Sequence, residues 1–155
     1  MSVTSGIQVA VLMGSLSDEP VMKKCLDYLD FFGISYEVHI LSAHRNPEKV
    51  DAFASDAENR GIQVIIAGAG MAAALPGVIA ARTTRPVIGV PLEGSALGGQ
   101  DALYSIVQMP PGIPVATVGI GNAKNAGLMA AHILAIENTK IRENKVDSFP
   151  IPYLH

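Results

Sequence analysis

The chain has 155 residues, of which 49% are hydrophobic and only 16% are charged, so disorder is excluded and much surface should be buried, in part between subunits. A net charge of −3 disfavours a nucleic-acid partner, and one cysteine with four scattered histidines excludes an internal disulfide and a Cys/His zinc site. No apolar run approaches the roughly 20 residues of a membrane span, so we expect one soluble, cytoplasmic domain over residues 1–155.

Short apolar runs rich in β-branched residues alternate with segments of helical spacing along the chain. The runs predict five strands, at residues 7–13, 35–41, 64–67, 86–90 and 115–118. Helices are predicted to follow them, near residues 18–33, 46–61, 71–82, 101–109 and 122–137. This alternation indicates an α/β fold, in which helices cover both faces of a parallel sheet. At this length we expect a flavodoxin-like three-layer sandwich with the strand order 2-1-3-4-5.

Residues at the element boundaries support these assignments. Asp18 is predicted to cap a helix, and Pro20 lies in the first turn of that helix, where its missing N–H costs nothing. Residues 68–70 (GAG) predict a tight turn after the third strand. Pro91 lies just beyond the fourth strand, and Asp101 is predicted to cap the short helix that follows.

The last predicted helix is apolar almost all round. Between residues 123 and 136 its only polar members are Lys124, Asn125 and His132. A helix without a solvated face is usually buried, so we expect this one to lie in the interface of a homo-oligomer. The end of the chain, residues 138–155, is polar and then proline-rich, which predicts an extended tail.

Ligands of an open α/β sheet bind at the carboxyl ends of its strands, where two polar loops are predicted. Residues 14–18 (GSLSD) lead into a helix N-terminus that suits a phosphate, and Asp18 can accept from ribose hydroxyls. The alternative is a serine-rich turn that Asp18 only caps. Residues 42–45 (SAHR) place a proton-transferring His44 beside Arg45, whose paired donors hold phosphate or carboxylate. A solvated loop is the alternative there.

A third motif, GAGMAA at residues 68–73, matches the dinucleotide fingerprint G-x-G-x-x-A, and Glu93 could serve as the acid that binds ribose. The fingerprint belongs on the first βα turn rather than the third. We therefore favour a tight glycine turn that lets the backbone approach some other ligand. Neither a P-loop motif nor a G-x-S-x-G nucleophile elbow occurs in the sequence.

With these segments in this order, the chain resembles the class I N5-carboxyaminoimidazole ribonucleotide mutases of purine biosynthesis. The matching stretches are MGSLSD (13–18), SAHRNPE (42–48), VIIAGAG (64–70), ALPG (74–77), RPVIGVP (85–91) and residues 102–135. Arg45 and the AGAG segment are those of class I. The class II carboxylases, which use free CO2, typically have lysine after the histidine.

The resemblance implies an isomerase that acts on a small nucleotide without a cofactor or a metal. Its substrate carries a carbamate on an exocyclic nitrogen, and its product carries that carboxyl group on a ring carbon. In the family, the carbamate loses CO2 in a closed pocket and the ring carbon recaptures it, while a histidine gives and then removes a proton. A glycine-lined, apolar pocket suits this chemistry because water must be excluded.

Carried over position by position, the resemblance assigns proton transfer to His44, phosphate binding to Ser15 and Arg45, and ribose binding to Asp18. Further pocket positions are Ser17, Ser42, Gly68, Ala69 and Leu97. The family is a homo-octamer with its sites at subunit contacts, which agrees with the apolar last helix.

Three positions depart from the family pattern. Met71 stands where members usually have glycine, Ala74 replaces a histidine that is commonly in the site, and Glu93 brings a negative charge near an anionic substrate. Two alternatives are left open. One is a carboxylase of aminoimidazole ribonucleotide that uses free CO2, and the other is a diverged nucleotide-binding relative without activity.

Overall fold

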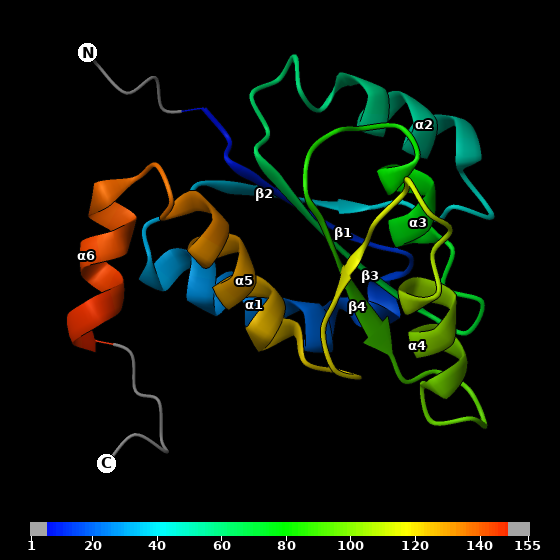
Figure 1. Ribbon diagram of the computed structural model, residues 1–155. Coiled ribbons are helices and arrows are strands. Elements are labelled where there is room, and N and C mark those ends of the chain that lie inside the picture. Colours follow the sequence, from blue (N-terminus) through cyan, green and yellow to red (C-terminus); the bar gives the residue numbers. More distant parts are fainter. Residues whose placement is uncertain (1–5, 149–155) are drawn as a thin grey trace.

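The computed structural model describes residues 6–148, which are arranged around a sheet of five parallel strands (Figure 1). The strands are β1 (Val9–Met13), β2 (Tyr36–Ile40), β3 (Val64–Gly70), β4 (Val87–Leu92) and β5 (Ala116–Thr117). Their order is β2-β1-β3-β4-β5, which confirms the predicted flavodoxin-like topology. Because neighbouring strands are parallel, their carboxyl ends meet at one edge of the sheet.

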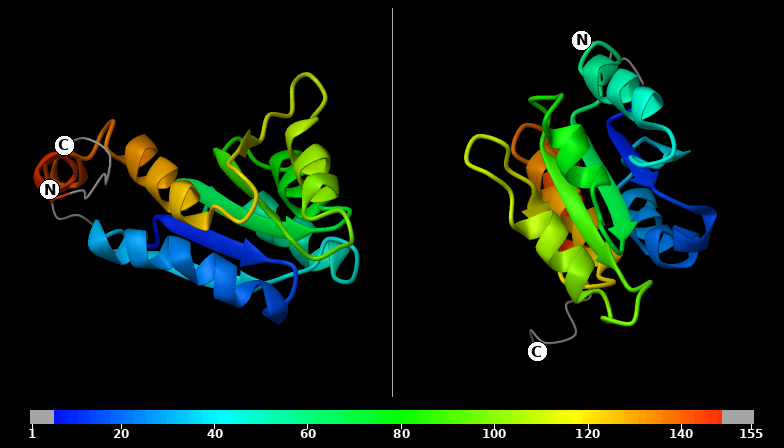
Figure 2. Two further views of the ribbon diagram at one scale, coloured as in Figure 1. Left: turned by 90° about the horizontal axis from the view of Figure 1, so that it is seen from below. Right: turned by 90° about the vertical axis from the view of Figure 1, so that its right-hand side faces the viewer.

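Helices cover both faces of this sheet (Figure 1). They are the 3-10 turn η1 (Leu16–Asp18) and α1 (Glu19–Phe31), α2 (Pro47–Asp56), α3 (Leu75–Ala80), α4 (Gln100–Val107), α5 (Ala123–Leu134) and α6 (Thr139–Ser148). α1 and α5 pack on one face, and α2, α3 and α4 pack on the other. Figure 2 shows α6 at the opposite end of the molecule from α4. Among residues 6–148, no helix has the length and apolar composition that a membrane crossing requires.

The side chains of β1 contribute to both helical layers. Val9, Val11 and Met13 belong to the core shared with α1 and α5, whereas Ala10 and Leu12 face the layer of α2 and α3. Successive side chains of a strand point to opposite faces, so a strand that is covered on both sides must be apolar throughout, and every residue of β1 is buried. β2 lies at the edge of the sheet and is only partly buried.

Several boundaries at the carboxyl edge differ from the sequence-based prediction. Residues 68–70 continue β3 instead of forming a glycine turn, because they pair in register with β4. Pro91 consequently lies inside β4, and α3 begins only at Leu75. Asp101 does not cap α4. It lies in the first turn, and the N-cap position is taken by Gly99, whose left-handed backbone (φ 86°) favours glycine.

The prediction of an extended tail is wrong for its first part, because residues 139–148 form α6. The carboxamide oxygen of Asn138 accepts hydrogen bonds from the backbone N–H groups of Lys140 at 3.1 Å and Ile141 at 3.2 Å, and the Ile141 side chain is buried in the core with α1 and α5. A cap and one buried apolar side chain therefore stabilise a helix in a segment of polar composition. Residues 149–155 lie outside the described part of the chain.

α5 is apolar because it packs closely on α1. Its buried residues are Ala123, Ala126, Gly127, Ala130, Ala131 and Leu134. A Cβ atom at Gly127 would lie 2.7 Å from the carbonyl oxygen of Cys25 and 3.1 Å from Cβ of Tyr28, so this glycine sets the distance between the two helices. Met129 and Ile136 remain exposed, which leaves part of the apolar surface of this region uncovered.

Replacing Gly127 with alanine should lower the free energy of unfolding by about 1–3 kcal/mol, because the new methyl group would press on the backbone of α1. Gly77→Ala in α3 is the matched control, since its Cβ would meet only the flexible end of the Met109 side chain and alanine has the higher helix propensity. Urea unfolding followed by circular dichroism measures both variants. Equal stabilities of the two variants would contradict the packing argument.

Candidate functional site

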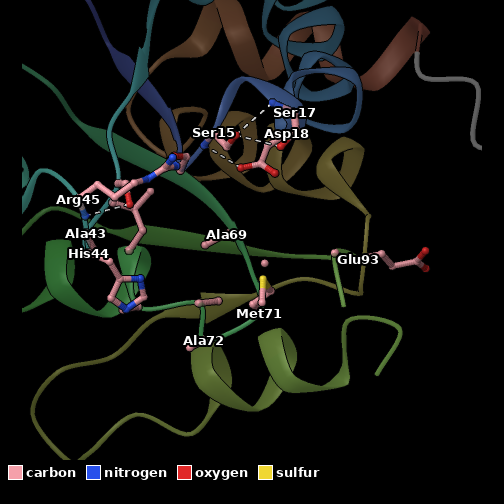
Figure 3. Close-up of a pocket in the computed structure, with 17 residues that line it drawn as sticks. Ser15, Ser17, Asp18, Ala43, His44, Arg45, Ala69, Met71, Ala72 and Glu93 are labelled. Atoms are coloured by element: carbon pink, nitrogen blue, oxygen red, sulfur yellow. Dashed lines mark hydrogen bonds between the residues drawn. The ribbon is translucent and has the colours of Figure 1, made fainter. Parts of the chain in front are cut away.

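A cavity of about 450 Å³ opens at the carboxyl edge of the sheet (Figure 3). Its walls are the turn after β1, the loop after β2, the segment from the end of β3 into α3, and the first residues after β4. The lining residues are Gly14, Ser15, Ser17, Asp18, Ser42–Arg45, Ala69–Leu75, Glu93 and Gly94. The connections that follow β1 and β3 run to opposite faces of the sheet, through α1 and α3 respectively, and α/β folds of this kind bind ligands at such a point.

The turn after β1 is closed by its own polar side chains. The Asp18 carboxylate accepts from the backbone N–H of Ser15 at 3.0 Å, and the Ser15 hydroxyl oxygen accepts from the backbone N–H of Ser17 at 3.3 Å. These bonds form a capping box around η1. Asp18 thus occupies the predicted position before α1, but its side chain makes no capping bond to α1. The Ser17 hydroxyl also donates to Oγ of Ser15 at 2.9 Å, which leaves the Ser15 hydroxyl proton available to a ligand.

Burial raises the pKa of Asp18, against the opposing effects of its hydrogen bond from Ser15 and the positive charge of Arg45. The cause is that withdrawal from water disfavours the ionised carboxylate. Hydroxyl groups of a bound molecule that donate to this carboxylate would replace the lost water. The side chain is therefore suited to binding a diol such as a ribose.

The loop after β2 brings a guanidinium group to the turn after β1. Nη2 of Arg45 donates to the carbonyl oxygen of Gly14 at 2.7 Å, and the backbone N–H of Arg45 donates to Oγ of Ser42 at 3.2 Å. The first bond occupies one donor and leaves the others free to bind an anion. The two polar loops that the sequence indicated as separate candidates therefore meet in one site.

His44 lines the same cavity and is exposed to solvent. In Figure 3 its imidazole ring points toward Ala72, whereas the guanidinium group of Arg45 points toward the turn that contains Ser15. The cavity consequently has one side suited to an anion and another where a proton-transfer group lies beside an apolar wall.

That apolar wall consists of residues at the end of β3 and before α3. Ala69, Ala72, Ala73 and Ala74 contribute only methyl groups to it. Met71 is the one non-glycine residue within the described chain that has a left-handed backbone, with φ 56°, a conformation that costs about 1–2 kcal/mol. The N–H groups of Ala73 and Ala74 donate to the carbonyl oxygens of Met71 at 2.9 Å and Ala72 at 2.7 Å. These two tight turns hold Met71 in place.

Most of the site residues expected from the sequence line the cavity. They are Ser15, Ser17, Asp18, Ser42, His44, Arg45 and Ala69. Gly68 and Leu97 are not among the lining residues. Gly68 lies within β3, where an added Cβ would collide with the sulfur of Met22, and Leu97 is exposed after β4.

Sequence reasoning gave no individual role to several lining residues that are small or apolar. They are Gly14, Ala43, Gly70, Ala72, Ala73, Leu75 and Gly94. Their only signal in the sequence is their position next to a strand end. Glu93, considered as a ribose-binding acid, does line the cavity, but Figure 3 shows its carboxylate turned away from the other labelled side chains. Because residues 68–70 are strand rather than a turn into a helix, their local structure does not support dinucleotide binding.

Comparison with known proteins finds relatives that match most of the chain. The family described as AIR carboxylase matches residues 8–149. The N5-carboxyaminoimidazole ribonucleotide mutase of Pyrococcus abyssi is 59% identical over 136 residues, which are 88% of this chain and 78% of that protein. The mutase of Thermotoga maritima is 58% identical over 134 residues, which are 86% of this chain and 78% of that protein. The crystal structure of Treponema denticola PurE has a TM-score of 0.81 at 33% identity, covering 88% of this chain and 85% of that one.

The matched region contains every strand of the sheet and both polar loops of the cavity. The two mutases share more than half of the aligned residues with this chain. These matches confirm the resemblance indicated by the sequence motifs, and the chain belongs to the AIR carboxylase family.

Proposed function

We propose that the chain is an N5-carboxyaminoimidazole ribonucleotide mutase, an isomerase of purine biosynthesis. It moves a carboxyl group from the exocyclic nitrogen to a ring carbon of aminoimidazole ribonucleotide. The observation that carries this proposal is the meeting of the His44–Arg45 loop and the Ser15–Asp18 turn in one cavity. The names of the similar proteins favour the isomerase over a carboxylase that uses free CO2.

The two sides of the cavity give the substrate its orientation in this proposal. The phosphate lies between the Ser15 hydroxyl and the free donors of Arg45, because a guanidinium binds phosphate oxygens with paired, charge-assisted hydrogen bonds. The ribose hydroxyls donate to Asp18, and the hydroxyls of Ser17 and Ser42 complete this polar side. The base then lies toward His44 and the alanine wall.

In this orientation His44 transfers a proton in two directions. The protonated imidazole gives its proton to the exocyclic nitrogen as the bond from nitrogen to the carboxyl carbon breaks, and the electron pair of that bond returns to nitrogen. This step leaves CO2, aminoimidazole ribonucleotide and a neutral imidazole. The ring carbon next attacks CO2, and the imidazole removes the proton from that carbon. Protons and electrons balance over the two steps, so one group that can both give and accept a proton suffices.

His44→Asn should reduce formation of the carboxylated product by about 10²–10⁴-fold, the usual contribution of a positioned acid–base group. Binding of the nucleotide should persist, because the phosphate contacts lie on the other side of the cavity. The assay uses substrate with a ¹³C-labelled carbamate in buffer with unlabelled bicarbonate. NMR of the product should show that the wild-type chain retains the label.

The matched control is His39→Asn, since His39 lies on β2 and contacts Glu37 and Phe53 rather than the cavity. Its turnover should stay close to that of the wild type. A product that takes its carboxyl carbon from bicarbonate would instead identify a carboxylase. Nucleotide binding without turnover of either kind would identify a non-catalytic relative, and full activity of His44→Asn would remove this residue from the mechanism.

Arg45→Ala should weaken binding of the carboxylated nucleotide by about 1.5–3 kcal/mol, because a hydrogen bond to a charged group is lost. Arg60→Ala is the matched control. The Arg60 guanidinium pairs with Glu37 at 2.6 Å and does not line the cavity, so its removal should leave the affinity unchanged. Isothermal titration calorimetry compares the two variants, and an unaltered affinity for Arg45→Ala would count against the phosphate clamp.

We also propose that the chain forms a homo-octamer in the cytoplasm. Support comes from large apolar side chains that are exposed on several elements, namely Val38, Ile40, Tyr104, Val107, Met129 and Ile136, because such surface is usually covered by another subunit. Light scattering of the full chain should give about eight times the chain mass of 16.2 kDa. A mass equal to that of one chain would refute the assembly.

A further inference from the structure

Met71 has a strained backbone conformation that the packing of its side chain does not compensate. Its φ of 56° lies in the region that favours glycine, and the residue is 59% exposed. A strained residue in a protein core is compensated by the packing of its side chain, but an exposed methionine gains little from packing. Strain that is retained at the rim of a cavity points to a contact made with a bound molecule.

The residues around Met71 are apolar, so its contact with a bound molecule is an apolar one. The three residues after it, Ala72–Ala74, and Ala69 before it end in methyl groups, and Leu75 is buried. Among the lining residues that the structure describes, Met71 is therefore the one long apolar residue that is exposed. It has three rotatable side-chain bonds and a polarisable sulfur, so it adapts to the shape of an apolar partner.

We propose that Met71 is a cover over the reacting end of the substrate, which keeps CO2 in the cavity between the two halves of the reaction. This inference rests on the proposed mutase function. CO2 carries no net charge, so Arg45 and Ser15 cannot hold it by charge-assisted bonds. Only enclosure by apolar groups prevents its escape and excludes the water that would compete for it.

The test is a single-turnover measurement with the enzyme in molar excess over the ¹³C-carbamate substrate, so that little unbound carbamate decays. The quantity measured is the fraction of nucleotide that ends as labelled product rather than as decarboxylated nucleotide. Met71→Ala and Met71→Gly should both raise the decarboxylated fraction several-fold. Met71→Leu should stay near the wild-type value, because leucine restores the apolar bulk.

The two small variants separate enclosure from backbone strain. Alanine keeps a Cβ at this left-handed position whereas glycine removes it, so equal leakage of CO2 by both variants assigns the effect to the lost side chain. Thermal unfolding should show that Met71→Gly is no less stable than the wild type, which excludes general loosening of the fold.

Two results would contradict the proposal that Met71 covers the reacting end of the substrate. One is a decarboxylated fraction equal to that of the wild type in both Met71→Ala and Met71→Gly. The other is a decarboxylated fraction for Met71→Leu as large as that for Met71→Ala. In either case the wild-type chain still converts the carbamate and the mutase function stands. A wild-type chain that forms no labelled product would refute the mutase function, and the proposed role of Met71 would then also be refuted.

Discussion

The register of β1 with its two neighbours is the constraint on which the site depends. Met13, the last residue of β1, pairs with Ile40 of β2 and with Gly68 of β3, so the segments that follow β1 and β2 leave the sheet at the same level, and the segment that follows β3 leaves it slightly further on, after Gly70. The bond from Arg45 to the carbonyl oxygen of Gly14 then joins two of these segments. A shift of β1 by one residue would turn each of its side chains to the other face, and it would also separate the two polar loops.

The same edge of the sheet is fixed from one face by α1. Met22 of α1 passes so close to the backbone of Gly68 that an added Cβ would collide with its sulfur. The contact lets α1 lie directly against β3, and α1 begins immediately after the Ser15–Asp18 turn. Packing therefore provides a physical reason for glycine at position 68, although the residue does not line the cavity. The close approach of α5 at Gly127 holds α1 from its other side.

Two local costs are concentrated at the cavity. The Asp18 carboxylate is partly withdrawn from water, which raises its pKa, and the Met71 backbone is held in a left-handed conformation. Neither would be expected in a region selected for stability alone, and both are usual where a fold is prepared for a ligand. Packing of the buried strands β1, β3 and β4 stabilises the fold and offsets these two local costs.

The sequence by itself determined the number and order of the strands, the two polar loops and the polar residues that line the cavity. It could do so because apolar runs and turn residues act locally, and because the rules for parallel connections leave few topologies. Only the tertiary structure decided that residues 68–70 extend β3 and that residues 139–148 are helical, since pairing with β4 and burial of Ile141 are contacts between distant segments. The alanine wall and the strained Met71 were likewise settled by tertiary structure, because a methyl group or an unusual φ carries no chemical signal until the chain has folded around it.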